Sequence, residues 1–165
     1  MSGEEKASQT PTHYSIEAAS EDKSKAIKRL VYDSGINPTA LDWRRFLVAL
    51  DEKRKVIGCG QLKSHADGSK EMASLAVGPA MRGQGIGGAL IEGLIASQDD
   101  GPLYLMCQSS LGPLYERFGF ERIDGEEMPK YFRRVSQLAG VLENLRVQGE
   151  TLFIMRRMPG ASQES

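Results

Sequence analysis

The chain has 165 residues, of which 40% are hydrophobic and 26% charged, as is typical of one globular domain large enough to bury a core. Its formal net charge of −1, without a run rich in Lys or Arg, argues against a nucleic-acid-binding protein. No apolar run approaches the roughly 20 residues that cross a bilayer, so a membrane protein is not expected.

The N-terminal segment predicts a disordered tail over residues 1–12, because its first ten residues are polar and lack the apolar core of a secretory signal. One domain is expected over residues 13–158, followed by a polar tail over 159–165. Cys59 and Cys107 lie in apolar runs, which indicates buried thiols in a reducing compartment. Neither cysteine has the spacing of a metal site, so we expect a cytoplasmic protein without a bound metal.

The hydrophobic pattern predicts hairpins first and alternating strands and helices later in the chain. Strands are expected at residues 13–18, 45–50, 55–63, 71–77, 103–107, 120–123 and 151–155. Helices are expected between Ser20 and Gly35, from Gly85 to about residue 100, over 111–118 and over 129–149. The last helix carries apolar residues at helical spacing, namely Phe132, Val135, Leu138, Leu142 and Leu145. This order indicates one α/β domain built on a mixed sheet.

Residues 77–90 carry the most informative motif of the chain. An apolar strand leads through Pro79 into Arg82 and a run with four glycines, and a helix follows. Glycines let backbone N–H groups approach a ligand closely, and the start of a helix adds unpaired N–H groups and a positive dipole end. The motif therefore predicts a phosphate or pyrophosphate site with Arg82 as a neighbouring charge.

A dinucleotide-binding loop is the first alternative, because Gly83, Gly85 and Gly88 satisfy G-x-G-x-x-G. In that loop the glycines follow the strand directly, and an acid stands about 20 residues further on. Here five residues intervene, Gln108 stands where the acid would be, and hairpins precede the motif. A Walker A loop is excluded because no Gly-Lys-Ser/Thr follows. A further interpretation is a glycine-rich turn that binds no ligand, but it would not explain why Arg82 and four glycines precede a helix.

At these residues the chain resembles the GNAT superfamily of acetyl-CoA-dependent N-acetyltransferases. Residues 82–87 match its Arg/Gln-x-x-Gly-x-Gly/Ala pyrophosphate loop, and residues 75–79 resemble its Leu-x-Val-x-Pro strand end. Residues 114–120 resemble its Leu-Tyr-x-x-x-Gly-Phe motif, whereas Gln108 and Leu111 stand where many members carry Asn and Ala. The resemblance covers about residues 13–158. It implies an α+β type of α/β domain with a mixed, mostly antiparallel sheet of about six to seven strands flanked by helices.

The resemblance also implies acetyl-CoA as co-substrate and no metal. Backbone groups of Leu75, Ala76 and Val77 would hold the pantetheine arm, and the Val77 N–H would stabilise the oxyanion. Gln108 would lie near the coenzyme at the end of the fifth strand. The residues expected at the pyrophosphate are Arg82, Gly83, Gln84, Gly85, Ile86, Gly87 and Gly88.

Two residues are expected to be catalytic. Tyr115 matches the family tyrosine that hydrogen-bonds or protonates the leaving thiolate, the other interpretation being a core tyrosine. Glu71 stands where the histone-acetylating branch keeps its catalytic glutamate, and is expected to accept the amine proton directly or through water. Two alternatives remain. Glu71 could be a solvated glutamate without a catalytic role, or His65 could be the base.

The acceptor is the least determined part of the prediction. The resemblance implies a pocket built by residues 33–43 and 124–149, in which Lys130, Arg133 and Arg134 either orient an acceptor carboxylate or form a solvated face. The expected function is transfer of acetyl to a primary amine of a small metabolite or amino acid, by direct attack with a tetrahedral intermediate. The alternatives are a protein or peptide N-acetyltransferase and a non-catalytic acyl-CoA-binding regulatory module. The expected partner is a small-molecule amine, with a homodimer left open and neither nucleic acid nor a membrane involved.

Overall fold

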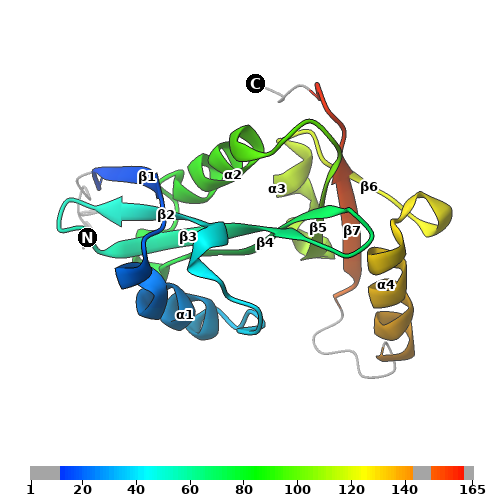
Figure 1. The fold of residues 1–165 in the computed structure, drawn as a ribbon, viewed down its shortest axis with the longest axis horizontal. Coiled ribbons are helices and arrows are strands. Elements are labelled where there is room, and N and C mark those ends of the chain that lie inside the picture. The colour runs from blue at the N-terminus through cyan, green and yellow to red at the C-terminus, as the bar shows by residue number, and fades with distance from the viewer. Residues whose placement is uncertain (1–11, 143–149, 162–165) are drawn as a thin grey trace, which may run out of the picture.

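In the part of the chain that the structure describes, seven strands form one sheet in the order β1-β2-β3-β4-β5-β7-β6 (Figure 1). The computed structural model describes residues 12–142 and 150–161. The strands are β1 (Tyr14–Ala18), β2 (Phe46–Asp51), β3 (Val56–Ser64), β4 (Lys70–Val77), β5 (Leu103–Gln108), β6 (Glu121–Arg122) and β7 (Leu152–Arg157). Neighbouring strands are antiparallel except β4 and β5, which run parallel. The predicted mixed, mostly antiparallel sheet is therefore confirmed.

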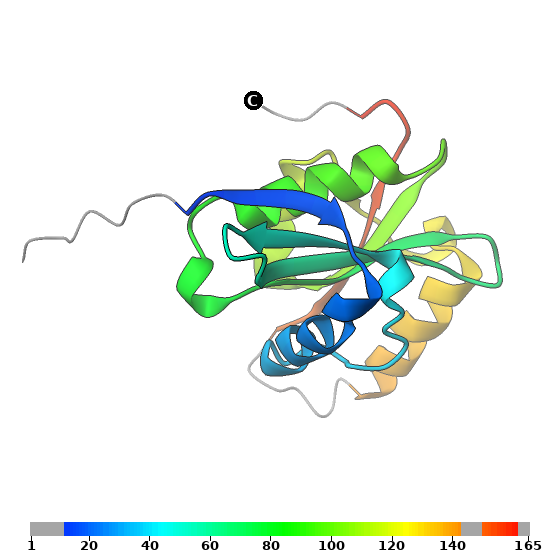
Figure 2. The same cartoon turned by 60° about the vertical axis from the view of Figure 1, so that its left-hand side comes forward.

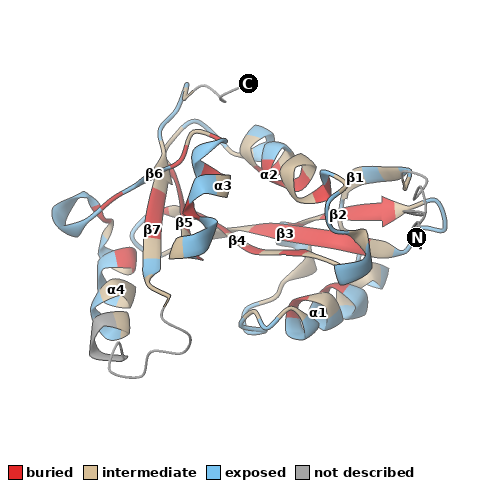
Figure 3. Ribbon diagram, turned by 180° about the vertical axis from the view of Figure 1, so that it is seen from behind, coloured by how far each residue is buried: buried red, intermediate tan, exposed pale blue. Residues whose placement is uncertain are grey.

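Helices cover both faces of this sheet. The α-helices of the described residues are α1 (Ser24–Asp33), α2 (Ile86–Ser97), α3 (Gly112–Glu116) and α4 (Lys130–Leu142). Figures 1 and 2 show α2 and α3 on one face and α1 and α4 on the other. Ile91 and Leu94 of α2 pack with Leu105 on the first face, whereas Ile27 of α1 and Phe132 of α4 are buried against the second. The central strands are therefore buried along most of their length (Figure 3).

Most expected elements are present, with their ends shifted by a few residues. The helix expected over 129–149 is α4, which the structure describes as far as Leu142; Leu145 lies outside the described residues. Residues 1–11 and 162–165, on which most of the two expected tails fall, also lie outside them. Both cysteines are buried as predicted. In the described part of the chain, no helix is long and apolar enough to span a bilayer.

Candidate active site

The parallel pair of β4 and β5 separates after a short stretch of pairing. The two strands are matched only at Lys70 with Leu103 and at Glu71 with Tyr104. Beyond this point β5 and its partner β7 run steeply across the direction of β2 and β3, as Figure 1 shows. The facing backbone edges of β4 and β5 therefore lack a strand partner within the described residues, and such edges can pair with an extended ligand.

A bulge in β4 accompanies this separation. The register between β3 and β4 shifts between Cys59 and Gln61, and Ser74 adopts a left-handed backbone with φ +55°. A bulge bends its strand and increases the local twist. The apolar and polar pattern of residues 71–77 contains no sign of this extra residue, so the sequence did not predict it.

A cavity of about 830 Å³ occupies the gap between the strands. It is lined by β4, the glycine loop, the end of β5 with α3, and the turn after α1. Ten of the residues expected at the coenzyme or in catalysis line it: Leu75, Ala76, Val77, Arg82, Gly83, Gly85, Ile86, Gly87, Gln108 and Tyr115. Three expected site residues do not line it, namely Glu71, Gln84 and Gly88. The volume lies within the usual range for small-molecule sites.

The glycine loop forms one end of the cavity. Gly83 and Gly85 have left-handed backbones with φ +80° and +79°, and Gly85 is the N-cap of α2. Left-handed residues ahead of a helix start favour anion binding, because they bring several N–H groups to one concave surface. Arg82 is the one charged side chain among the described residues of the cavity lining. The geometry therefore fits the pyrophosphate of a coenzyme.

Two loop residues have contacts outside the cavity. The Gln84 side-chain oxygen accepts a hydrogen bond of 2.9 Å from the backbone N–H of Thr12. A Cβ atom at Gly88 would lie 3.4 Å from the Phe118 ring, so this glycine allows α2 and the segment after α3 to pack closely. Only the backbone of Gln84 is then free to serve the coenzyme, since its side chain is engaged elsewhere.

The backbone N–H of Val77 is directed towards the gap by the hydrogen-bond pattern of the sheet. The N–H of Gly78 donates to the carbonyl oxygen of Ile57 in β3. N–H groups of an antiparallel edge strand point alternately to either side, so the neighbouring Val77 N–H points away from β3. This is the orientation that an oxyanion donor at Val77 requires.

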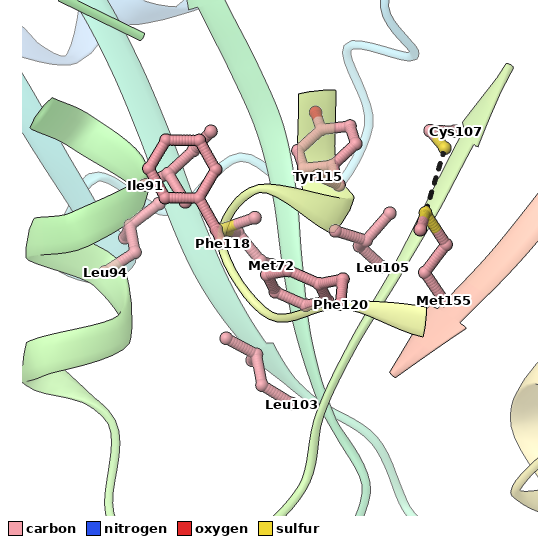
Figure 4. Close-up of a cluster of buried hydrophobic side chains, with 10 residues drawn as sticks. All are labelled: Met72, Ile91, Leu94, Leu103, Leu105, Cys107, Tyr115, Phe118, Phe120 and Met155. Atoms are coloured by element: carbon pink, nitrogen blue, oxygen red, sulfur yellow. Dashed lines mark hydrogen bonds between the residues drawn. The ribbon is translucent and has the colours of Figure 1, made fainter. Parts of the chain in front are cut away.

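Tyr115 closes the side of the cavity opposite β4. It lies on α3 in the core cluster that Figure 4 shows, together with Cys107 of β5. Burial, and secondarily the neighbouring Cys107, raises the pKa of Tyr115 to about 12. Burial and nearby Glu150 raise the pKa of the Cys107 thiol to about 11. Both side chains are therefore neutral at physiological pH, and the Tyr115 hydroxyl can act as a hydrogen-bond donor.

The buried Glu71 and the partly buried His65 form a pair beside the separation of the strands. The His65 Nε2 and Glu71 Oε1 atoms are 2.8 Å apart, and Glu71 is 3% exposed. The His65 ring stacks on Tyr131 of α4 with 3.5 Å between ring centroids. The interpretation of Glu71 as a solvated glutamate is therefore wrong, because the β3–β4 hairpin folds over it and packs on α4. The two alternative bases are partners in one hydrogen bond.

Comparison with known proteins assigns the family. A family model described as an acetyltransferase (GNAT) domain matches residues 42–122, which contain the glycine loop, Glu71 and Tyr115. The chain belongs to the GNAT acetyltransferase family. A comparison with curated proteins finds no significant match.

Solved structures share the GNAT fold over most of the chain. An N-acetylglutamate synthase from Neisseria gonorrhoeae, complexed with coenzyme A and N-acetyl-glutamate, is 20% identical with a TM-score of 0.69 over 90% of this chain and 35% of that one. Rv2747 from Mycobacterium tuberculosis, in complex with CoA and NLQ, is 25% identical with a TM-score of 0.66 over 87% of this chain and 98% of that one. A GNAT acetyltransferase from Staphylococcus aureus is 14% identical with a TM-score of 0.64, over 88% of this chain and 98% of that one. The chain thus spans about a third of the synthase.

The expected acceptor side of this GNAT domain is only partly found. Ser34, Gly35 and Ile36, from the turn after α1, line the cavity, whereas none of the residues 124–139, whose side chains the structure describes, does so. Arg133 instead donates to the backbone carbonyls of Glu126 and Met128. Lys130 and Arg134 line a separate hollow of about 230 Å³. The structure therefore does not bring these three cations to the cavity. Ser74 and Met106 line it without having been predicted.

Proposed function

We propose that this protein transfers the acetyl group of acetyl-CoA to a primary amine of a small metabolite or amino acid. The observation that carries the proposal is the cavity between the separated strands, which joins the glycine loop to Tyr115. An open β4 edge suits an extended pantetheine arm, and the glycine loop suits the pyrophosphate next to it. Both features therefore adjoin one cavity, which supports the proposal of a coenzyme A site there.

The proposed roles of the residues follow from what each can donate or accept. Backbone groups of Leu75 and Val77 hold the pantetheine, and the Val77 N–H stabilises the carbonyl oxygen as it gains negative charge. Tyr115 donates a hydrogen bond to the leaving thiolate. Glu71, in its pair with His65, accepts the amine proton through water, because Glu71 does not itself line the cavity.

The proposed acceptor is small because the cavity is bounded on the acceptor side by the turn after α1. Ser74 of β4 and Met106 of β5 also line the cavity. Two similar structures are complexes of coenzyme A with N-acetyl-glutamate and with NLQ, which supports an amino acid as the first acceptor to test. A protein or peptide acceptor would instead need a groove open to an extended chain.

The proposal is tested by measuring free thiol released from acetyl-CoA in the presence of amino acids, alkyl amines and peptides. We expect release that depends on a small amine. Binding of acetyl-CoA without release for any amine would favour the acyl-CoA-binding module, and release with peptides alone would favour the protein acetyltransferase.

A matched pair of glycine variants tests the coenzyme site. Gly85 and Gly68 both have left-handed backbones, with φ +79° and +87°, and a Cβ at either would meet no atom within 4 Å. Gly85→Ala and Gly68→Ala therefore introduce similar backbone strain, of about 1–2 kcal/mol. We expect only Gly85→Ala to weaken acetyl-CoA binding in calorimetry. Equal affinities of the two variants would contradict the assignment of the loop.

A further inference from the structure

The bulge in β4 decides which face of the sheet the Ser74 side chain takes. Met72 packs on the α2 face of the sheet, and strict alternation would send Ser74 to the same face. The bulge lets Leu75 take that place, where it packs close to Gly60. The Ser74 hydroxyl instead accepts a hydrogen bond from Gln61 on the face that carries α1, and Ser74 is among the residues that line the cavity.

The conformation of Ser74 is unusual for a residue with a side chain. A φ of +55° at a non-glycine residue costs of order 1–3 kcal/mol, and such residues cluster at functional sites. A glycine would adopt this backbone without strain. A serine here therefore needs a reason beyond the bend of β4, and its hydroxyl is the group that glycine would lack.

Gln61 holds that hydroxyl from a fully buried position. Its Nε2 donates a hydrogen bond of 2.8 Å to Ser74 Oγ, and the residue is 0% exposed. Its Oε1 has no hydrogen-bond partner among the described residues. A buried amide with one unpaired end is costlier than a leucine or methionine of similar size. What the amide supplies in return is a fixed orientation of the Ser74 hydroxyl.

Ser74 lines the cavity and has hydrogen-bonding capacity beyond its contact with Gln61. A hydroxyl has one donor and two acceptor positions, and Gln61 takes one acceptor position. An amine about to attack a thioester must keep its lone pair free and can offer only its N–H groups. A serine oxygen beside it can accept one of these and so direct the lone pair.

We propose that Ser74, oriented by Gln61, accepts a hydrogen bond from the attacking amine and thereby sets the position of the acceptor. The inference rests on the proposed acetyl transfer and deepens it. In this arrangement Ser74 contacts the substrate, whereas Gln61 acts through Ser74 as a positioning residue.

The test compares Ser74→Gly, Ser74→Ala and Gln61→Met with the wild-type protein. Ser74→Gly removes the hydroxyl and relieves the backbone, so it separates the two contributions of the serine. We expect both Ser74 variants to lower kcat/KM for the amine about 10-fold or more, the effect of one lost hydrogen bond to a reacting group. Gln61→Met is expected to lower it less, and Ser74→Gly combined with Gln61→Met no further than Ser74→Gly alone.

A binding measurement distinguishes positioning from a structural role. The dissociation constant of acetyl-CoA should remain within twofold of wild type in all variants. Ser97→Ala is the control, since this hydroxyl bonds to backbone carbonyls of α2 away from the cavity. A Ser74→Gly variant with wild-type kcat/KM, or with an equal loss of acetyl-CoA affinity, would overturn the inference. A wild-type protein that acetylates no amine would overturn the proposed function itself, and this inference with it.

Discussion

Replacement of Tyr115 by Phe tests the role of a buried phenol at the leaving thiolate. Among the described residues its hydroxyl has no hydrogen-bond partner, and the residue lines the cavity. Phenylalanine therefore leaves no buried group unpaired, and we expect an unchanged free energy of unfolding. The effect on turnover should come from the hydroxyl alone.

The size of the effect follows from the pKa of the phenol. Burial raises the pKa of Tyr115 to about 12, and an ordinary thiol has a pKa near 8.5. Full proton transfer from this tyrosine to the thiolate is then uphill by about 5 kcal/mol. Tyr115 should therefore stabilise the thiolate as a donor without losing its proton. A hydrogen bond to a charged group contributes about 1.5–3 kcal/mol, so Tyr115→Phe should lower kcat about 10- to 100-fold.

The assay is thiol release at saturating amine from pH 6 to 10, with acetyl-CoA affinity measured in parallel. We expect profiles of the same shape for the wild type and Tyr115→Phe, because the phenol stays protonated throughout. An affinity within twofold of wild type is expected as well. An ionisation between pH 8 and 10 that disappears in the variant would refute the reasoning, as would a loss of binding equal to the loss of rate.

Three further predictions concern stability, measured by chemical denaturation. Gly60→Ala should lower the free energy of unfolding by about 1–3 kcal/mol, because the new Cβ would lie 2.8 Å from Cδ1 of the buried Leu94. His65→Ala should lower it by a similar 1–3 kcal/mol, because Glu71 loses its hydrogen-bond partner while buried. Burial raises the pKa of Cys59 from 9.0 to about 12. The contribution of the neutral thiol to the free energy of unfolding is therefore complete below pH 9 and is lost as the pH rises towards 12. That loss is about 1.4 kcal/mol per pH unit, and Cys59→Ala should reduce the alkaline slope accordingly.

Each of these predictions has a matched control or a contrary outcome. Gly78→Ala is the control for Gly60→Ala, since its Cβ would meet its nearest atom at an ordinary 3.6 Å. For His65, a variant as stable as wild type would show that water satisfies the Glu71 carboxylate. For Cys59, an unchanged alkaline slope in the alanine variant would assign the slope to other groups.

Local patterns in the sequence predict much of the fold and of the donor site. Residues 82–87 are contiguous, and their conformation depends mainly on glycine and on the helix that follows, so spacing alone indicated a phosphate site. The strands were predicted because alternation and turn residues are local signals. Their ends were less accurate, since pairing with neighbours decides where a strand stops.

The acceptor side depended on contacts that no local pattern encodes. Glu71 and His65 were separate candidates until the hairpin between β3 and β4 brought them within 2.8 Å. The sequence makes Arg133 a candidate for a substrate carboxylate, whereas in the structure its guanidinium donates to backbone carbonyls. Ser74 was not a candidate at all, because one extra residue in a strand leaves no trace in composition.

The sequence by itself determined the family motifs, the order of the elements and the residues expected at coenzyme A, because these depend on neighbours along the chain. The tertiary structure alone decided that β4 and β5 pair at only two positions and then separate. It also decided which side chains reach the space between them. That space is formed by strands distant in sequence and by a shift in register, and both arise only when the sheet is assembled.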